Sequence, residues 1–200
     1  MKQWIILTAD MSESVVSPEQ SHVFIIKNFL TEAEADAIYD EVLRVEPELM
    51  KLGPHRYGGV EGDKLTGRFS YYNALNNELV GSILKPKFVS LFGEGRWYQA
   101  WFNTFRKGDR IKPHVHNDKS NPAPNRLKYF QCCNLFLGGT EADGTYYNGV
   151  QFPNTKGGLL VFRDDIPHWT NEYQGDDVRI SMACDIHPTR QNHNAKKLNV

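Results

Sequence analysis

The chain of 200 residues contains no long hydrophobic run, and neither sign of charge is in excess. A membrane-spanning helix needs about 20 consecutive apolar residues. The apolar run near the N-terminus covers only residues 4–7, so we expect neither a membrane span nor a signal peptide. Lys and Arg number 23 against 24 Asp and Glu, for a net charge of −1. Nucleic-acid binding needs a surplus of basic side chains on some surface, and the composition gives no support for such a partner.

Cysteine is also scarce, with only Cys132, Cys133 and Cys184 in the chain. An odd number of cysteines without a secretory signal predicts reduced thiols and a cytoplasmic location. Cys132 and Cys133 are adjacent in an apolar run that resembles a buried strand. Neighbouring residues of a strand point to opposite faces, so we expect two packed core cysteines rather than a redox pair.

The composition is that of a globular protein, with 40% hydrophobic and 12% aromatic residues. The length suits one domain over residues 1–200. We expect N-terminal helices and supporting strands over 1–95, a β-rich catalytic core over 96–187 and a flexible tail over 188–200.

Two helices are predicted in the N-terminal part. Thr31 and Glu34 have the spacing of a capping box, and apolar residues follow at helical spacing, which predicts a helix over 32–45. A second helix is expected over 77–92, with Pro86 breaking or kinking it. Strands are expected at 23–30, running into the first helix, and at 68–73.

After residue 95 the chain consists of short β-rich runs separated by turn residues. These runs are 97–105, 110–116, 127–137, 145–152, 158–162, 168–172 and 178–186. Their number and close spacing predict a sandwich or barrel. With the helices in front, the fold class is α+β but mainly β, built on a jelly-roll core.

A cluster of potential metal ligands lies in the second of these runs. If the segment is extended, His114, His116 and Asp118 project from the same face. A mononuclear iron site of two histidines and one carboxylate takes two ligands close in sequence and one from elsewhere, and it leaves positions open. His168 is the candidate for the distant ligand.

A possible carboxylate clamp follows the last histidine. Arg179 and Ser181 share one face of a predicted strand, and a guanidinium beside a hydroxyl can hold one carboxylate. A metal site alone has no need of such a clamp.

The H-x-D of His116 and Asp118, the distant His168 and the R-x-S of Arg179 and Ser181 together resemble the signature of the Fe(II)/2-oxoglutarate-dependent oxygenases. The segment 103–108 resembles the strand and turn before the metal motif in prolyl 4-hydroxylase-like and AlkB-like members. The resemblance implies a double-stranded β-helix (jelly-roll) core, and it implies iron(II), 2-oxoglutarate and dioxygen as cofactor and co-substrates. It also makes Asn103 a candidate contact for 2-oxoglutarate.

The resemblance leaves the third metal ligand open. Counted from Asn103, His114 and His116 occupy the place of H-x-D, and a related group of phage and bacterial oxygenases carries H-x-H there. If the H-x-D motif is instead read directly from the sequence, His116 and Asp118 occupy this place. His116 and His168 are ligands in both versions, and either His114 or Asp118 completes the set.

The leading functional hypothesis is a dioxygenase that hydroxylates a C–H bond of an amino acid, peptidyl residue or small metabolite, with release of succinate and carbon dioxide. One alternative is AlkB-like nucleic-acid demethylation. The net charge of the chain argues against it. So does Asp185, because those enzymes resemble this chain here but carry a second arginine near this position. Another is a cupin-like metal-binding jelly roll without catalysis. The loop 117–126 and the hairpin 144–149 are candidates for a lid. Four aromatic residues could line a pocket, although core packing is the commoner role: Tyr146, Tyr147, Phe152 and Trp169.

Overall fold

The structure is a computed structural model, which describes residues 6–7, 23–51, 67–68, 73–116, 131–140 and 144–187. Asp118, the predicted lid loop over 117–126 and the predicted tail over 188–200 lie outside the described residues.

The described chain contains two β-sheets. The larger sheet has seven strands in the spatial order β1 (Ile6–Leu7), β2 (Val23–Ile26), β8 (Leu159–Arg163), β5 (Gln131–Gly138), β10 (Arg179–His187), β4 (Trp97–Phe105) and β3 (Gly67–Arg68). The smaller sheet has the order β7 (Val150–Phe152), β6 (Thr145–Tyr147) and β9 (His168–Thr170). All neighbours are antiparallel except β1 and β2.

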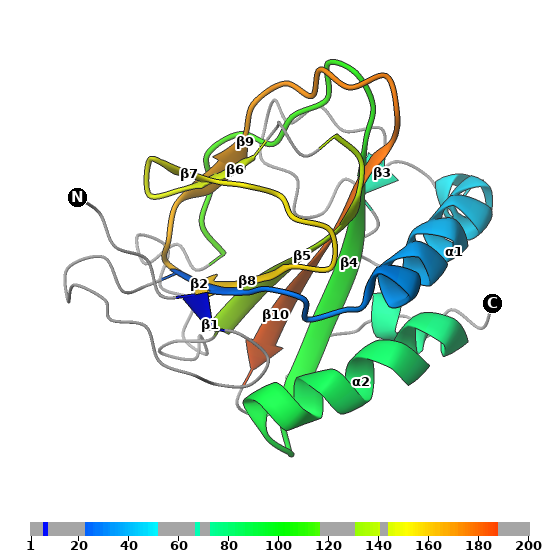
Figure 1. Ribbon diagram of the computed structural model, residues 1–200, viewed down its shortest axis with the longest axis vertical. Coiled ribbons are helices and arrows are strands. Elements are labelled where there is room, and N and C mark those ends of the chain that lie inside the picture. The colour runs from blue at the N-terminus through cyan, green and yellow to red at the C-terminus, as the bar shows by residue number, and fades with distance from the viewer. Residues whose placement is uncertain are drawn as a thin grey trace.

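The two sheets and two helices form layers (Figure 1). The small sheet lies on one side of the long strands, and α1 (Glu32–Lys51) and α2 (Glu78–Phe92) lie on the other. A short 3₁₀ helix, Ala74–Asn76, precedes α2. The predicted fold class, a mainly β jelly-roll core with N-terminal helices, is confirmed.

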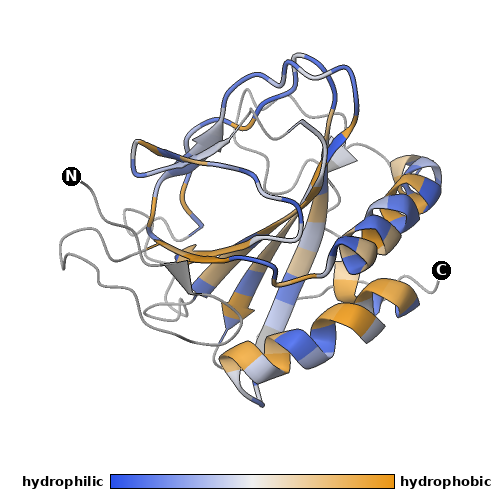
Figure 2. Cartoon of the chain, viewed as in Figure 1, coloured by the Kyte–Doolittle hydropathy of each residue, from blue (hydrophilic) through white to orange (hydrophobic). Residues whose placement is uncertain are grey.

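The outer face of the large sheet carries the main hydrophobic core. Alternate residues of its long strands pack against the apolar sides of both helices, and the hydropathy colouring shows these sides in orange (Figure 2). Fully buried members on the strands are Ala100, Phe102, Cys133, Leu135, Leu137, Ile180, Met182 and Cys184. Members on the helices are Ala35, Ile38, Val42, Val80, Leu84 and Phe88.

The inner face of the same strands carries a second core and a cavity. Cys132, Leu160 and Phe162 pack there with residues of the smaller sheet. Cys132 and Cys133 therefore belong to different cores, and both are buried free thiols. The prediction that the two cysteines pack on opposite faces of a strand is confirmed.

The first helix begins as predicted and ends later. The Thr31 hydroxyl accepts from the Glu34 N–H at 3.2 Å, and the Glu34 carboxylate accepts from the Thr31 N–H at 2.8 Å. These two bonds are the reciprocal pair of a capping box. The helix continues through Pro47 to Lys51, beyond the predicted end at 45. Glu46, buried and bonded to Arg106, and the buried Leu49 anchor this last part.

The second helix is not broken at Pro86 and runs on to Phe92. Phe88, fully buried, stacks on Phe29 and on Tyr98, with ring centroids 5.8 and 5.4 Å apart. This packing holds the turn that follows the proline. None of the helices in the described part of the chain has both the length and the apolar character that crossing a membrane requires.

Several of the predicted β segments differ in detail: the strand expected over 23–30 ends at Ile26, and the run over 168–172 ends at Thr170. The run over 145–152 is a hairpin, in which Asn148 and Gly149 have the positive φ values, 47° and 81°, of a tight turn. The run over 110–116 is not a regular strand, because its backbone pairs with its neighbours only at single points. It still passes beside β9, where the Thr170 N–H donates to the Ile111 carbonyl at 3.0 Å.

Candidate metal centre

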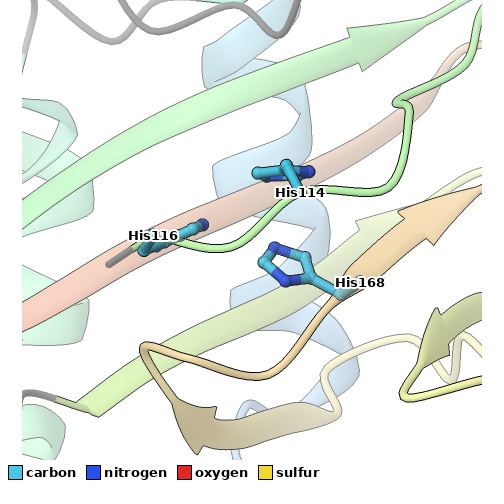
Figure 3. A group of neighbouring side chains, drawn as sticks. All are labelled: His114, His116 and His168. Atoms are coloured by element: carbon cyan, nitrogen blue, oxygen red, sulfur yellow. The ribbon is translucent and has the colours of Figure 1, made fainter. Parts of the chain in front are cut away.

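Three histidines from two parts of the chain meet on the inner side of the large sheet. His114 and His116 lie in the segment after β4, and His168 is the first residue of β9. Each offers one ring nitrogen within 4.8 Å of the others. Figure 3 shows His114 and His116 on one loop, with His168 facing them.

Backbone bonds hold these histidines in place. His114 and His168 form an antiparallel bridge, with N–H to carbonyl bonds of 3.1 and 3.0 Å in the two directions. The His116 N–H donates to the Asp164 carbonyl at 2.9 Å. The His168 ring is also stacked on Tyr147, with centroids 5.6 Å apart.

The outward nitrogen of each ring has an acceptor. Nδ1 of His114 lies 2.9 Å from the Lys112 carbonyl, and Nδ1 of His168 lies 2.9 Å from the Ile166 carbonyl. Nδ1 of His116 lies 2.5 Å from Oδ1 of Asp185. A carbonyl or carboxylate oxygen only accepts, so each Nδ1 is the donor, and in a neutral ring Nε2 then carries the lone pair. Metal-ligating histidines have this arrangement of the outer nitrogen.

A buried thiol lies beside the Asp185–His116 pair. Sγ of Cys132 lies 3.2 Å from Nδ1 of His116 and donates to Oδ1 of Asp185 at 3.4 Å. Burial raises the pKa of the Cys132 thiol well above its usual value, and the nearby Asp185 carboxylate adds to the effect. The thiol is therefore protonated and acts as a donor.

The candidate carboxylate clamp lines the same cavity as the three histidines. Arg179 is 1% exposed, and its Nη2 donates to Oγ1 of Thr145 at 3.0 Å. Its Cζ lies 4.7 Å from the centroid of the Phe105 ring. Ser181 and Asn103, both buried, are directly opposite each other on β10 and β4.

One cavity contacts both the three histidines and the candidate clamp. Its empty volume, open mouth included, is about 430 Å³. Its wall includes six predicted site residues, His114, His116, His168, Asn103, Arg179 and Ser181. The structure therefore brings together every predicted site residue that it describes.

The structure also places the four aromatic residues that were considered for a pocket lining. Trp169 lines the cavity, and the Tyr146 ring stacks on the Trp169 ring with centroids 5.2 Å apart and planes 4° apart. Tyr147 and Phe152 are core residues, as their position in strands predicted.

Sequence comparisons give no relative. No protein-family model and no curated protein matches the chain.

Solved structures with a similar fold are nevertheless found. The α-ketoglutarate-dependent carbocyclase SnoK from nogalamycin biosynthesis superposes with a TM-score of 0.63 at 16% identity, over 90% of this chain and 87% of that one. HygX from Streptomyces hygroscopicus, with nickel and 2-oxoglutarate bound, gives 0.60 at 12% identity, over 88% of each chain. A prolyl-4-hydroxylase from Pseudomonas putida gives 0.56 at 18% identity, over 86% of this chain and 95% of that one. This chain has the 2-oxoglutarate oxygenase fold. The predicted resemblance is thereby confirmed at the level of the fold.

The donor set of this 2-oxoglutarate oxygenase fold fits a metal ion. Three neutral imidazoles with their Nδ1 protons bonded outward are suitable nitrogen ligands for a divalent transition metal. The set departs from two histidines and one carboxylate, because in the described chain His114 completes the group. Asp118, the other predicted third ligand, lies outside the described residues, and the choice stays a prediction.

Three further residues of the site were not predicted from the sequence. Asp185 and Trp101 follow from the strand period, because Asp185 shares a face with Arg179 and Ser181, and Trp101 with Asn103. Counting onward by two along each strand would have found both. Thr145, which bonds Arg179 from the smaller sheet, leaves no such signal, since its contact depends on how the two sheets pack.

Proposed function

We propose that the chain is an Fe(II)- and 2-oxoglutarate-dependent dioxygenase that hydroxylates a C–H bond of an amino acid, a peptidyl residue or a small metabolite. The observation that carries this proposal is the cavity itself. It has three converging histidines on one side and a buried arginine beside a serine on the other. A metal-binding jelly roll without catalysis needs only the first of these features.

In this proposal His114, His116 and His168 hold the iron. Their rings are fixed before a metal arrives, because each Nδ1 is bonded and two of the three residues share a backbone bridge. Iron(II) held there would supply dioxygen activation coupled to the oxidation of 2-oxoglutarate to succinate and carbon dioxide. The protein's contribution is to position the reactants and to exclude water.

Arg179 binds the far carboxylate of 2-oxoglutarate in the same proposal. A guanidinium can donate two parallel hydrogen bonds to a carboxylate, and burial strengthens them because water does not compete. Thr145 and Phe105 hold the guanidinium in place. The Ser181 hydroxyl and the Asn103 amide lie on the same face and can donate further hydrogen bonds.

The substrate would enter between the metal and the mouth of the cavity. Trp169, backed by Tyr146, offers a flat apolar wall there. The prolyl-4-hydroxylase and the carbocyclase with this fold are named for different reactions, so the fold does not select one substrate. Three free cysteines support a cytoplasmic location.

The test is an anaerobic titration of the purified chain with Fe(II) and 2-oxoglutarate. We expect the weak visible charge-transfer band of a chelated 2-oxo acid, which requires the chain, iron and 2-oxoglutarate together. On admission of oxygen we expect succinate to form. Zinc in place of iron is the control and gives neither signal. A chain that binds iron but shows no band and forms no succinate would contradict the proposal and leave a metal-binding jelly roll.

A further inference from the structure

The His116 ring differs from the other two rings in what its outward nitrogen contacts. His114 and His168 donate to neutral backbone carbonyls at 2.9 Å. His116 donates to the carboxylate of Asp185 at the shorter distance of 2.5 Å. One imidazole of the three therefore has an anion behind it.

The surroundings of this pair keep water away. The side chains of His116 and Asp185 are 8% and 18% exposed. Cys132, fully buried, donates its S–H to the same carboxylate oxygen. The rings of Trp101 and Phe162 lie 5.7 and 6.1 Å from the His116 ring. A buried carboxylate costs free energy unless it is bonded, and here two donors satisfy one of its oxygens.

The three histidines of the proposed metal site carry no negative charge, which gives a physical reason for this carboxylate. Three neutral imidazoles bring no negative charge to a metal ion, whereas the usual iron set includes one carboxylate. Along the inner face of β10 the residues are Arg179, Ser181, Ala183, Asp185 and His187. Asp185 is the only acid on this face of the described strand, and Arg179 lies six residues from it (185 − 179), about 20 Å along the strand. The anion lies behind the histidines, and the cation lies where the 2-oxoglutarate carboxylate would bind.

We propose that Asp185 is a positioning residue of the metal centre, which fixes the ring of His116 and supplies negative charge from behind this ligand. The proposal rests on the metal site of the proposed function. A carboxylate acceptor orients a ligating imidazole and makes its other nitrogen a stronger ligand. Asp185 would thus supply the negative charge that a carboxylate ligand usually brings, without itself being a ligand.

A second arrangement of the same groups competes with this one. His116, Cys132 and Asp185 themselves lie within 4.8 Å of one another and could hold an ion. In that arrangement His116 would bind through Nδ1, Cys132 through a thiolate and Asp185 directly. The two arrangements differ in the nitrogen used and in the presence of sulfur, so spectroscopy separates them.

The first experiment measures metal affinity in Asp185→Asn. The amide keeps the shape and can still accept from Nδ1, but it carries no charge. We expect the dissociation constant for Mn(II) or Co(II) to rise about 10- to 100-fold, the usual effect of losing such an outer partner, with the melting temperature of the metal-free chain unchanged. Asp185→Glu should recover part of the affinity. Unchanged affinity in Asp185→Asn overturns the proposal.

The matched control is Asp177→Asn. Asp177 is also an aspartate near β10, but it accepts from Tyr173 and Thr140 instead of a histidine. Its loss should leave metal affinity unchanged, and an equal loss in both variants overturns the proposal. A wild-type chain that binds no metal overturns this proposal and the proposed function together. A chain that binds metal but no 2-oxoglutarate contradicts the proposed function alone, because metal affinity in Asp185→Asn still decides the role of Asp185.

The second experiment uses the wild-type chain and does not depend on any variant folding. In the zinc-loaded protein, nitrogen-edited NMR of the imidazole rings should show three Nδ1–H tautomers, with the His116 proton furthest downfield. The cobalt-loaded protein should show no thiolate-to-metal absorption. An Nε2–H tautomer for His116, or a thiolate band, overturns the proposal in favour of an ion held by Cys132 and Asp185.

Discussion

His114 and His168 exchange both of their backbone hydrogen bonds, although 54 positions separate them in the chain (168 − 114). The two side chains of a directly opposed antiparallel pair lie on the same side, and here the ring centroids are 4.2 Å apart. Their placement therefore comes from the backbone, so the proposed metal site would be formed before a metal binds.

This pairing leads to a prediction about the third ligand. His114→Ala leaves the backbone bridge in place and removes one imidazole, so the metal-free fold should melt at the same temperature. Metal affinity should fall by more than the roughly 10- to 100-fold that an outer partner contributes. Metal content after purification, measured for His114→Ala and Asp118→Ala, tests this. Iron retained in His114→Ala and lost in Asp118→Ala would assign the ligand to Asp118.

Arg179→Ala should weaken 2-oxoglutarate binding and leave metal binding intact. Hydrogen bonds to charged groups contribute about 1.5–3 kcal/mol each, which corresponds to roughly 10- to 100-fold in affinity. Calorimetric titration of the metal-loaded chain measures the change. Arg110→Ala is a suitable control, because Arg110 pairs with Glu172 at the surface with both side chains about half exposed. Parallel loss of metal and 2-oxoglutarate in Arg179→Ala would show that Arg179 is structural.

Thr145→Val tests whether the smaller sheet positions the clamp. Valine keeps the shape of threonine but removes the hydroxyl that accepts from Arg179 and donates to Asn154. We expect 2-oxoglutarate affinity to fall up to about tenfold, which corresponds to about 1.4 kcal/mol. Thr145→Ser keeps the hydroxyl and should bind as the wild type does. If Thr145→Val binds 2-oxoglutarate as tightly as the wild type, then Phe105 and the β10 backbone suffice to hold the Arg179 guanidinium in place.

Gly139→Ala should disturb the clamp through the backbone. Gly139 has a φ of 110°, and a Cβ there would lie 2.5 Å from Cα of Arg179. We expect a loss of about 1–3 kcal/mol in the free energy of unfolding, with weaker 2-oxoglutarate binding. Gly149→Ala is the matched control: its φ of 81° is also positive, but a Cβ there meets no atom within 4 Å. The control should lose stability without losing affinity, as urea unfolding and titration would show.

Glu46 should make stability depend on pH in the acid range. Burial acts to raise the pKa of its carboxyl, but hydrogen bonds from Arg106 and Thr104 outweigh burial, and the pKa lies below its usual value of 4.5. A lowered pKa stabilises the fold above the unfolded value, and this contribution is lost as the pH falls through the folded value. Glu46→Gln should thus be less stable than wild type at pH 7, with the difference shrinking below about pH 4.5. Glu48→Gln, at an exposed pair with Lys51, should show no such trend.

The sequence predicted the parts of the fold that depend on local chemistry. The capping box at Thr31 fixed the start of a helix, because its two hydrogen bonds lie within four residues. Strand alternation placed Cys132 and Cys133 in different cores. The end of the first helix was missed, since Glu46 and its partners Arg106 and Thr104 are about 60 positions apart in the chain.

Part of the candidate site was also predicted from the sequence, again because it depends on local spacing. His114 with His116, and Arg179 with Ser181, are close pairs whose spacing follows one stretch of backbone. Thr145 reaches Arg179 from another sheet, and no local pattern announces such a contact. Asp185 could have been found by extending the alternation of β10 by four residues.

The two faces of β10 have a consequence for how this chain tolerates insertions and deletions. Odd-numbered positions from Arg179 to Asp185 lie on the inner face of the sheet, where the first three line the cavity, and even-numbered positions from Ile180 to Ile186 face the main core. Removing one residue just after Arg179 would exchange these two sets. The carboxylate of Asp185 would then enter the helix-packed core, and apolar side chains would move to the inner face. Length changes within β10 should therefore be lethal to folding, whereas the hairpin turn at Asn148 and Gly149, which ends at the surface, offers a place where the chain length can vary.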